Sequence, residues 1–326
     1  MKHIVLAVLL AFGAQSATAQ SQPTPPFWEA EWPNTDFSKT SVSYVEILSG
    51  GPPKDGIPAL DGAEFYGVNE DQQIQDVEPI VTVELEGETP RAYPIRYLMW
   101  HEIVNDRIGE VPVTVTFCPL CNSALVFDGR LNGQELTFGV SGKLRNSDMV
   151  MYDRQTESWW QQFSGDAIVG DLLGAELTQL PGWMESFAEF KARNPEGLVM
   201  KEPNARRRYG ENPYAGYDSL KKPFLYNGEN PPHGIEPLAR VLRVGDSAWP
   251  LERIRSEGEI VEEGLRIVWS DSGQVSALDK GRISASKSVG TVRVFDADTG
   301  APAVHEVVFA FAFHAFTPEG TWHISG

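Results

Sequence analysis

The chain has 326 residues, of which 41% are hydrophobic and 22% are charged, and its formal net charge is −18. This is an ordinary globular composition, sufficient for one large domain or two smaller ones. The acidic balance repels nucleic-acid phosphates and anionic lipid, so we expect no nucleic-acid partner. Beyond the N-terminal segment, no apolar run approaches the roughly 18–20 residues of a spanning helix, so we expect no membrane span.

The N-terminal segment has the pattern of a targeting signal. Lys2 and His3 precede an apolar run from Ile4 to Phe12, and Ala17-Thr18-Ala19 forms a cleavage signal. The pattern predicts a signal peptide over residues 1–19 with cleavage near Ala19, and therefore a periplasmic or secreted protein. In such an oxidising compartment a pair of neighbouring cysteines can form a disulfide.

The rest of the chain predicts an α+β fold that is β-rich, with mostly antiparallel strands and short helices. We divide it into an N-terminal arm rich in proline and aromatic residues (20–41), a β-rich half that holds both cysteines (42–203), an irregular Arg/Tyr/Pro-rich connector (204–235) and a second β-rich half (236–326). The arm is expected to be extended and to pack through its aromatic side chains.

Alternating apolar residues predict the strands, and apolar residues at helical spacing predict the helices. The predicted helices cover residues 98–104 and 183–193. The predicted strands, in chain order, are 42–48, 80–85, 113–117, 124–127, 136–140, 149–152, 159–163 and 306–316.

Two short strings recur about 150 residues later in the same order, which is the pattern of an internal repeat. Arg91–Leu98 resembles Ser247–Ile254, and Met151–Thr156 resembles Val294–Thr299. The similarity leaves open whether the chain holds two related halves. If it does, the second half, which lacks cysteine, is structural or covers the site.

Cys118 and Cys121 are the only cysteines, spaced C-x-x-C at a tight turn between two strands. Three chemistries fit them. A catalytic dithiol needs a lowered thiol pKa, usually from a following helix, but a strand follows here. A metal site resembles the knuckle of zinc ribbons and rubredoxins, although no second knuckle exists. A structural disulfide would close a very short loop and would gain little stability from it.

Further ligands would have to be histidine or methionine. His101 lies on the preceding predicted helix, as the third ligand or the base that activates the thiolate, and Met149 and Met151 share one face of a nearby strand. Two thiolates with an imidazole or thioether suit copper or zinc. No phosphate-binding glycine loop or dinucleotide motif is present, so we expect no nucleotide cofactor.

Several strings together resemble an exported prokaryotic family catalogued as domain of unknown function 3179. The resemblance implies no activity, but it implies that the His101 and Cys118 strings belong together. The strings that carry it are Arg91-Ala92-Tyr93-Pro94, Trp100-His101-Glu102-Ile103-Val104-Asn105-Asp106, Thr116-Phe117-Cys118-Pro119-Leu120-Cys121-Asn122-Ser123-Ala124, Met151-Tyr152-Asp153-Arg154-Gln155-Thr156 and Asn212-Pro213-Tyr214-Ala215-Gly216-Tyr217-Asp218.

The sequence therefore predicts a periplasmic or secreted protein with a soft-metal or redox site on the CxxC turn. Its candidate site residues are Cys118, Cys121, His101, Met149 and Met151, and its partner is a metal ion, a small molecule or a thiol. The alternatives are a thiol–disulfide oxidoreductase and a non-catalytic binding module with a structural CxxC disulfide.

Overall fold

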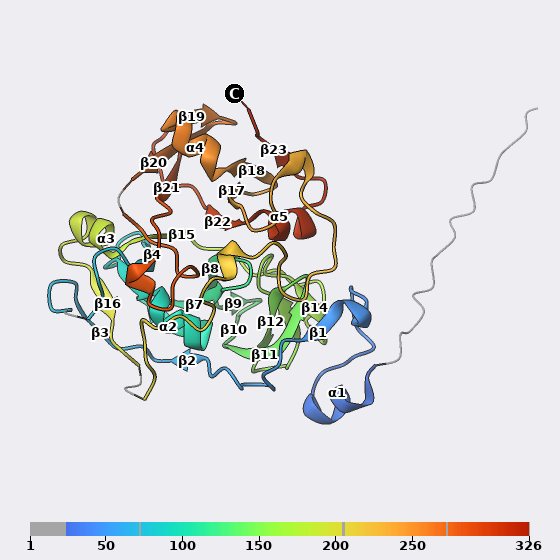
Figure 1. Ribbon diagram of the computed structural model, residues 1–326. Coiled ribbons are helices and arrows are strands. Elements are labelled where there is room, and N and C mark those ends of the chain that lie inside the picture. Colours follow the sequence, from blue (N-terminus) through green and yellow to red (C-terminus); the bar gives the residue numbers. More distant parts are fainter. Residues whose placement is uncertain (1–23, 72, 204–205, 272, 326) are drawn as a thin grey trace, which may run out of the picture.

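The computed structural model describes residues 24–71, 73–203, 206–271 and 273–325 (Figure 1). The predicted signal peptide, residues 1–19, lies outside the described residues. As predicted, the fold is built mainly from antiparallel strands joined by short helices.

The first half contains a five-stranded sheet in the order β15-β4-β5-β16-β3. A helix follows β5 and another follows β15. The elements are β3 (Phe65–Gly67), β4 (Pro79–Val83), β5 (Arg91–Pro94), α2 (Ile95–His101), β15 (Gly182–Ser186), α3 (Phe187–Arg193) and β16 (Leu198–Met200).

A second sheet, in the order β2-β6-β7-β8, carries both cysteines at one end. Its strands are β2 (Leu60–Asp61), β6 (Ile103–Ile108), β7 (Val111–Cys118) and β8 (Ser123–Asp128). Strands β7 and β8 form the predicted hairpin around the CxxC turn, in register from Val113↔Asp128 to Cys118↔Ser123. The ribbon β9 (Arg130–Leu131) and β10 (Gln134–Glu135) follows.

A third sheet, β1-β11-β12-β13-β14, packs against the N-terminal arm. Trp28 and Trp32 of the arm pack edge-on against Trp159. The arm is not wholly extended, because Pro26 begins α1 (Pro26–Glu31) at a position that needs no amide hydrogen. The strands are β1 (Ile47–Ser49), β11 (Phe138–Arg145), β12 (Asp148–Asp153), β13 (Trp159–Gln161) and β14 (Ala167–Val169).

The second half, in orange and red in Figure 1, has a sheet β22-β17-β18-β23 and a sheet β19-β20-β21. Its elements are β17 (Arg240–Val244), β18 (Ser247–Pro250), α4 (Leu251–Glu257), β19 (Glu259–Glu262), β20 (Leu265–Ser270), β21 (Thr291–Asp296), β22 (Glu306–Phe309), α5 (Ala310–Phe316) and β23 (Thr321–Trp322). Short 3-10 turns lie at Tyr44–Glu46, Tyr217–Ser219, Pro232–Gly234 and Ile283–Ala285.

The two halves share one topology. In the first, β4 pairs antiparallel with β5 and β15, and β5 pairs parallel with β16. In the second, β17 pairs antiparallel with β18 and β22, and β18 pairs parallel with β23. A helix follows the second strand of each half, and an antiparallel meander then follows, β6-β7-β8 or β19-β20-β21. We call these two units the first and second repeat.

The sequence similarities fall on this topology in different ways. Arg91–Leu98 and Ser247–Ile254 occupy equivalent places, the second strand and the start of its helix. Met151–Thr156 and Val294–Thr299 do not, because β12 belongs to the inserted sheet whereas β21 corresponds to β8. Their likeness is local: in each, an aspartate carboxylate at the strand end, Asp153 or Asp296, accepts bonds from the threonine that follows.

Four predicted elements were wrong in extent or type. Residues 98–104 begin as helix, but α2 ends at His101 and strand β6 starts at Ile103. Residues 183–193 begin as strand β15, and the helix starts only after Ser186, whose side chain forms a capping box with Glu189. Residues 306–316 alternate like a strand, but β22 pairs with β17 only through Phe309, and helix α5 follows. In 42–48, a 3-10 turn precedes β1, which starts only at Ile47.

The largest hydrophobic cluster draws on both repeats and contains both cysteines. It therefore joins the two halves rather than dividing them into separate cores. In the described residues, no helix is both long and apolar enough to cross a membrane.

Candidate metal centre

The CxxC turn is anchored at every residue that it contains or borders. The amide of Asn122 donates to the carbonyl of Pro119 (3.3 Å), and Asn122 adopts a left-handed φ of 53°. The Tyr217 hydroxyl donates to the Leu120 carbonyl (3.1 Å). The fixed turn places the sulfurs of Cys118 and Cys121 side by side, and the side chains of both are buried.

The second repeat holds the turn from outside. The amide of Phe309, the last residue of β22, donates to the Cys121 carbonyl (2.8 Å). The Asn122 side chain donates to the Val307 carbonyl (2.9 Å), and the Ser123 hydroxyl donates to the Glu306 carboxylate (3.0 Å). Strand β22 thus fixes the turn without contributing a cysteine.

A second hairpin brings a carboxylate to the sulfurs. Strands β11 and β12 are joined by Asn146 and Ser147, whose φ angles of 50° and 63° are those of a two-residue turn matched to strand twist. Asp148 is the first residue after that turn and has no exposed surface. The turn therefore sets the position of the Asp148 side chain.

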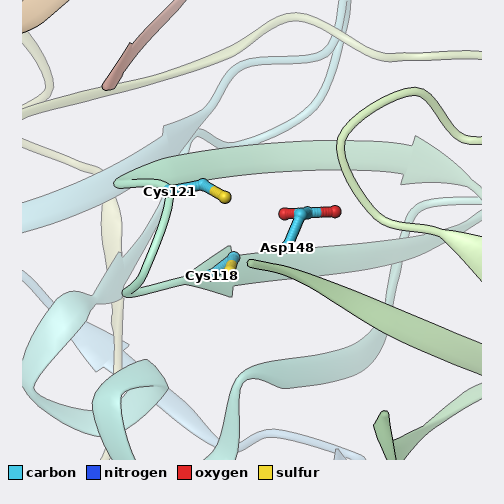
Figure 2. Close-up of side chains that lie close together, drawn as sticks. All are labelled: Cys118, Cys121 and Asp148. Atoms are coloured by element: carbon cyan, nitrogen blue, oxygen red, sulfur yellow. The ribbon is translucent and has the colours of Figure 1, made fainter. Parts of the chain in front are cut away.

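Cys118, Cys121 and Asp148 form one compact cluster (Figure 2). The two sulfurs and one oxygen of the Asp148 carboxylate lie within 4.8 Å of one another. The other interactions of the sulfurs are weak, since Cys121 donates to the Ser147 carbonyl at 3.5 Å and Cys118 lies 4.0 Å from it.

The two oxygens of the Asp148 carboxylate differ in their hydrogen bonds. Its Oδ2 atom accepts from the Gln161 side chain (2.6 Å) and from the Phe163 amide (3.0 Å). Its Oδ1 atom is buried, and no described residue gives it a hydrogen bond. An acceptor left in this state costs about 1–3 kcal/mol, which a bound cation would offset.

The electrostatics of the cluster oppose ionisation. Burial raises the pKa of both thiols, and the neighbouring Asp148 raises both further, with Glu102 adding to the effect on Cys118. Burial also raises the pKa of Asp148 to about 6, against the opposing effects of the Gln161 and Phe163 hydrogen bonds and of the two neighbouring thiols. The cluster is a set of acidic groups in a low-dielectric site, which is where a cation is most stabilised.

Glu102 is a second buried carboxyl group beside the cluster. Burial raises its pKa to about 8, Asp148 adds to the rise, and a hydrogen bond from Tyr214 opposes it. Glu102 caps α2 with a φ of 58°, a left-handed conformation that is costly for a residue other than glycine. Strain of this kind commonly marks a functional position.

The predicted site residues are only partly brought together. Cys118 and Cys121 meet, whereas His101 is not in the cluster: its Nδ1 lies 2.8 Å from the Pro58 carbonyl and its Nε2 2.7 Å from the Tyr209 hydroxyl. Met149 and Met151 are buried in the same hydrophobic cluster as the cysteines. Their proposed role as thioether ligands stays a prediction.

Asp148 and Glu102 did not emerge from the sequence as site residues. The signal for Asp148 is the Asn146-Ser147 pair, which marks a tight hairpin turn and fixes the next residue at a strand start. The signal for Glu102 is weaker, since only the structure shows that the carboxyl side chain and not the neighbouring imidazole of His101 lies beside the cysteines.

Comparison with known proteins supports the resemblance seen in the sequence. No curated protein and no solved structure matches the chain. A family model described as a protein of unknown function (DUF3179) matches residues 54–320, which include every residue of the cluster and both repeats apart from strand β23. The chain therefore belongs to the DUF3179 family.

Proposed function

We propose that the protein binds one zinc-class divalent metal ion through Cys118, Cys121 and Asp148. The observation that carries the proposal is the cluster itself: two thiols and a carboxylate with one unpartnered oxygen converge in a buried site. Metal binding displaces the thiol protons and makes both sulfurs ligands, so it removes the cost that burial imposes on the separate acidic groups.

The donor set favours zinc over copper. Cu(I) prefers soft sulfur donors alone, whereas zinc accepts thiolate and carboxylate oxygen together. Three protein ligands leave one position of a tetrahedral ion for water or a substrate, which is the pattern of catalytic rather than structural zinc sites.

A reactive dithiol is less well supported. Redox cysteines are partly exposed and have thiol pKa values lowered by a helix N-terminus or a cation. Both thiols here are buried with raised pKa values, and strand β8 follows the turn. These features also disfavour a thiol–disulfide oxidoreductase.

Export is part of the proposal. If residues 1–19 direct the chain to the periplasm or outside the cell, the two thiols meet an oxidising environment. Coordination would then protect them, because metal-bound thiolates do not readily exchange with disulfides. N-terminal sequencing of protein recovered from the periplasm tests the export step separately from the metal.

The test is elemental analysis of protein purified without chelator, together with a thiol count in denaturant before and after chelation. We expect about one zinc per chain and two thiols that react only after the metal is removed. Cys118→Ser, Cys121→Ser and Asp148→Asn should each reduce the zinc content by about tenfold or more. Ser270→Ala is the matched control, because Ser270 takes the place of Cys118 in the second repeat.

Full zinc retention in Cys118→Ser, with an unchanged circular dichroism spectrum, would overturn the proposal. So would wild-type protein that takes up no zinc, copper or cobalt at equimolar concentration. One copper per chain in place of zinc would keep the site and reject the metal assignment.

A further inference from the structure

A cleft of about 710 Å³ lies directly beside the metal centre. Part of its wall is formed by Leu120, which lies between the two cysteines, by Met149, which follows Asp148, and by Glu102. The three proposed ligands are not among the described residues that line it. The cleft is therefore a separate space whose wall is the outer surface of the metal site.

The lining of the cleft is mainly hydrophobic, and its volume is within the 300–1,000 Å³ that small-molecule sites typically occupy. Polar groups are few, and one of them, Glu102, is already bonded to Tyr214, which also lines the cleft. Besides Leu120 and Met149, the hydrophobic side chains that line it come from three further stretches of the chain: Ile57, Val140 and Leu144, and Leu220, Phe224 and Leu225.

One edge of the cleft exposes hydrophobic side chains to solvent. Leu220, Phe224 and Leu225 are 54%, 47% and 37% exposed, and all three line the cleft. Scattered exposed hydrophobic residues are normal, but several gathered at a concave surface indicate a binding site. We call residues 220–225 the cleft edge.

The cleft edge is also basic. Lys221 and Lys222 are both exposed, and Lys222 lines the cleft. No described acidic side chain lies within ion-pair distance of either lysine, although the chain has 45 acidic and 27 basic residues. Unpaired lysines beside an apolar cleft favour a ligand with an apolar body and an anionic head.

We propose that the cleft binds a single-chain amphiphilic carboxylate, with the apolar chain against Leu120, Leu144 and Met149 and the head group at Lys222. The proposal goes beyond the metal site, because none of its contacts involves Cys118, Cys121 or Asp148. The ligand would touch the CxxC turn through Leu120, so the two sites would be adjacent.

The experiment is isothermal titration calorimetry of the full chain with dodecanoate below its micellar concentration. Dodecanol and dodecyltrimethylammonium serve as the neutral and cationic comparisons of equal chain length. We expect saturable binding of about one dodecanoate per chain, with weaker binding of dodecanol and weakest binding of the cation. Equal affinity for all three would overturn the assignment of the head group to the lysines.

Two variants test the two ends of the ligand. Lys222→Glu should weaken dodecanoate binding by about threefold to tenfold and leave dodecanol unchanged, as expected for an exposed charge pair. Ala215→Trp, at an exposed lining position, should block both ligands. Lys280→Glu is the matched control, since Lys280 is exposed and does not line the cleft.

The failure of this proposal can be told apart from that of the metal site. Dodecanoate binding is also measured on Asp148→Asn, which should lose zinc and keep the cleft. If that variant binds dodecanoate normally, the cleft is established whatever the metal result. Binding of the full chain to phosphatidylglycerol vesicles, without binding to dodecanoate monomers, would instead identify the cleft edge as a lipid-surface contact and overturn the proposal.

Discussion

The two repeats share one topology but differ in the residues at two positions. One position is the residue between the helix and the first strand of the meander (β6 or β19), and the other is the last residue of the second strand (β7 or β20). Each repeat turns from its helix into its meander at one residue, Glu102 in the first and Gly258 in the second. The backbone is the same, since the carbonyl of each accepts a bond from the far strand, from Phe117 (2.8 Å) and from Trp269 (2.9 Å).

The next residue in each far strand is Cys118 or Ser270. After Cys118 the chain returns at once through the CxxC turn, whereas after Ser270 it makes a long excursion before β21. The same backbone hydrogen bond therefore forms whichever residues occupy these positions. The first repeat has a strained carboxylate where the second has glycine, which suits the positive φ, and a thiol where the second has a serine. A residue that costs backbone energy beside a reactive group is the pattern of a functional site.

The first way to break this comparison is to remove the support that the second repeat gives to the first. Arg243 on β17 pairs with Glu306 (2.6 Å) and donates to the Phe163 carbonyl (3.0 Å), and Glu306 holds Ser123 beside the CxxC turn. Arg243→Ala leaves the buried Glu306 carboxylate without its charged partner. We expect the free energy of unfolding, measured by urea denaturation, to fall by about 3–5 kcal/mol.

The control for that experiment is an exposed ion pair in the same repeat. Arg266 lies 3.3 Å from Glu259, and both side chains are largely in solvent. Arg266→Ala should cost less than about 1 kcal/mol. Equal losses in the free energy of unfolding for the two variants would mean that the second repeat does not stabilise the site through Glu306. If Arg243→Ala does not fold, Arg243→Lys should show a smaller loss in the same direction.

The second prediction concerns pH and the buried Glu102. The pKa of Glu102 is about 8 in the folded protein, whereas the ordinary value for a glutamate carboxyl, as in the unfolded chain, is 4.5. Between these values the folded state holds a proton that the unfolded state has released, so unfolding becomes easier as pH rises. The contribution of Glu102 is fully present below pH 4.5 and is lost as pH rises through 8.

Glu102→Gln removes this titration and keeps an amide that can bond to Tyr214. Metal-free wild type should therefore lose roughly 2–4 kcal/mol relative to Glu102→Gln between pH 5 and pH 8. The measurement is urea denaturation at several pH values with chelator present. Parallel pH profiles for the two proteins would show that Glu102 is not a buried, proton-holding group.

The sequence predicts local features well and tertiary placement poorly. The hairpin β7–β8 follows from alternating Val and Thr and from a C-x-x-C turn, and both cysteines meet as expected. Phe311 and Phe313 mislead, because they alternate with alanine as in a strand, yet they belong to a helix whose first four residues, Ala310 to Phe313, are all buried.

The site shows the same division. Cys118 and Cys121 are close in sequence, so their meeting needs only the turn. Asp148 reaches them across a sheet-to-sheet contact that no local pattern reveals, and its preceding Asn-Ser turn sets only its place in its own hairpin. The sequence pointed to His101, but the residue beside the cluster is its neighbour Glu102. The positive φ of Glu102, at the end of α2, directs its side chain there.

The smallest expected effect is the free-energy cost of the positive φ at Glu102, which the second repeat avoids by having glycine at the equivalent position. Glu102→Gln and Glu102→Gly both remove the charge, but only glycine relieves the left-handed φ of 58°. Glycine is therefore expected to be more stable than glutamine there by about 1 kcal/mol, less whatever the lost Tyr214 bond contributes. At Gly258, whose φ is 77°, the reverse change Gly258→Gln should cost a similar amount. Urea denaturation at a single pH gives both differences, because neither Glu102 variant has an ionisable group at this position and the two proteins compared at Gly258 share the same Glu102. A Glu102→Gly variant no more stable than Glu102→Gln, alongside a clear loss in Gly258→Gln, would show that the first repeat has adapted to its non-glycine cap.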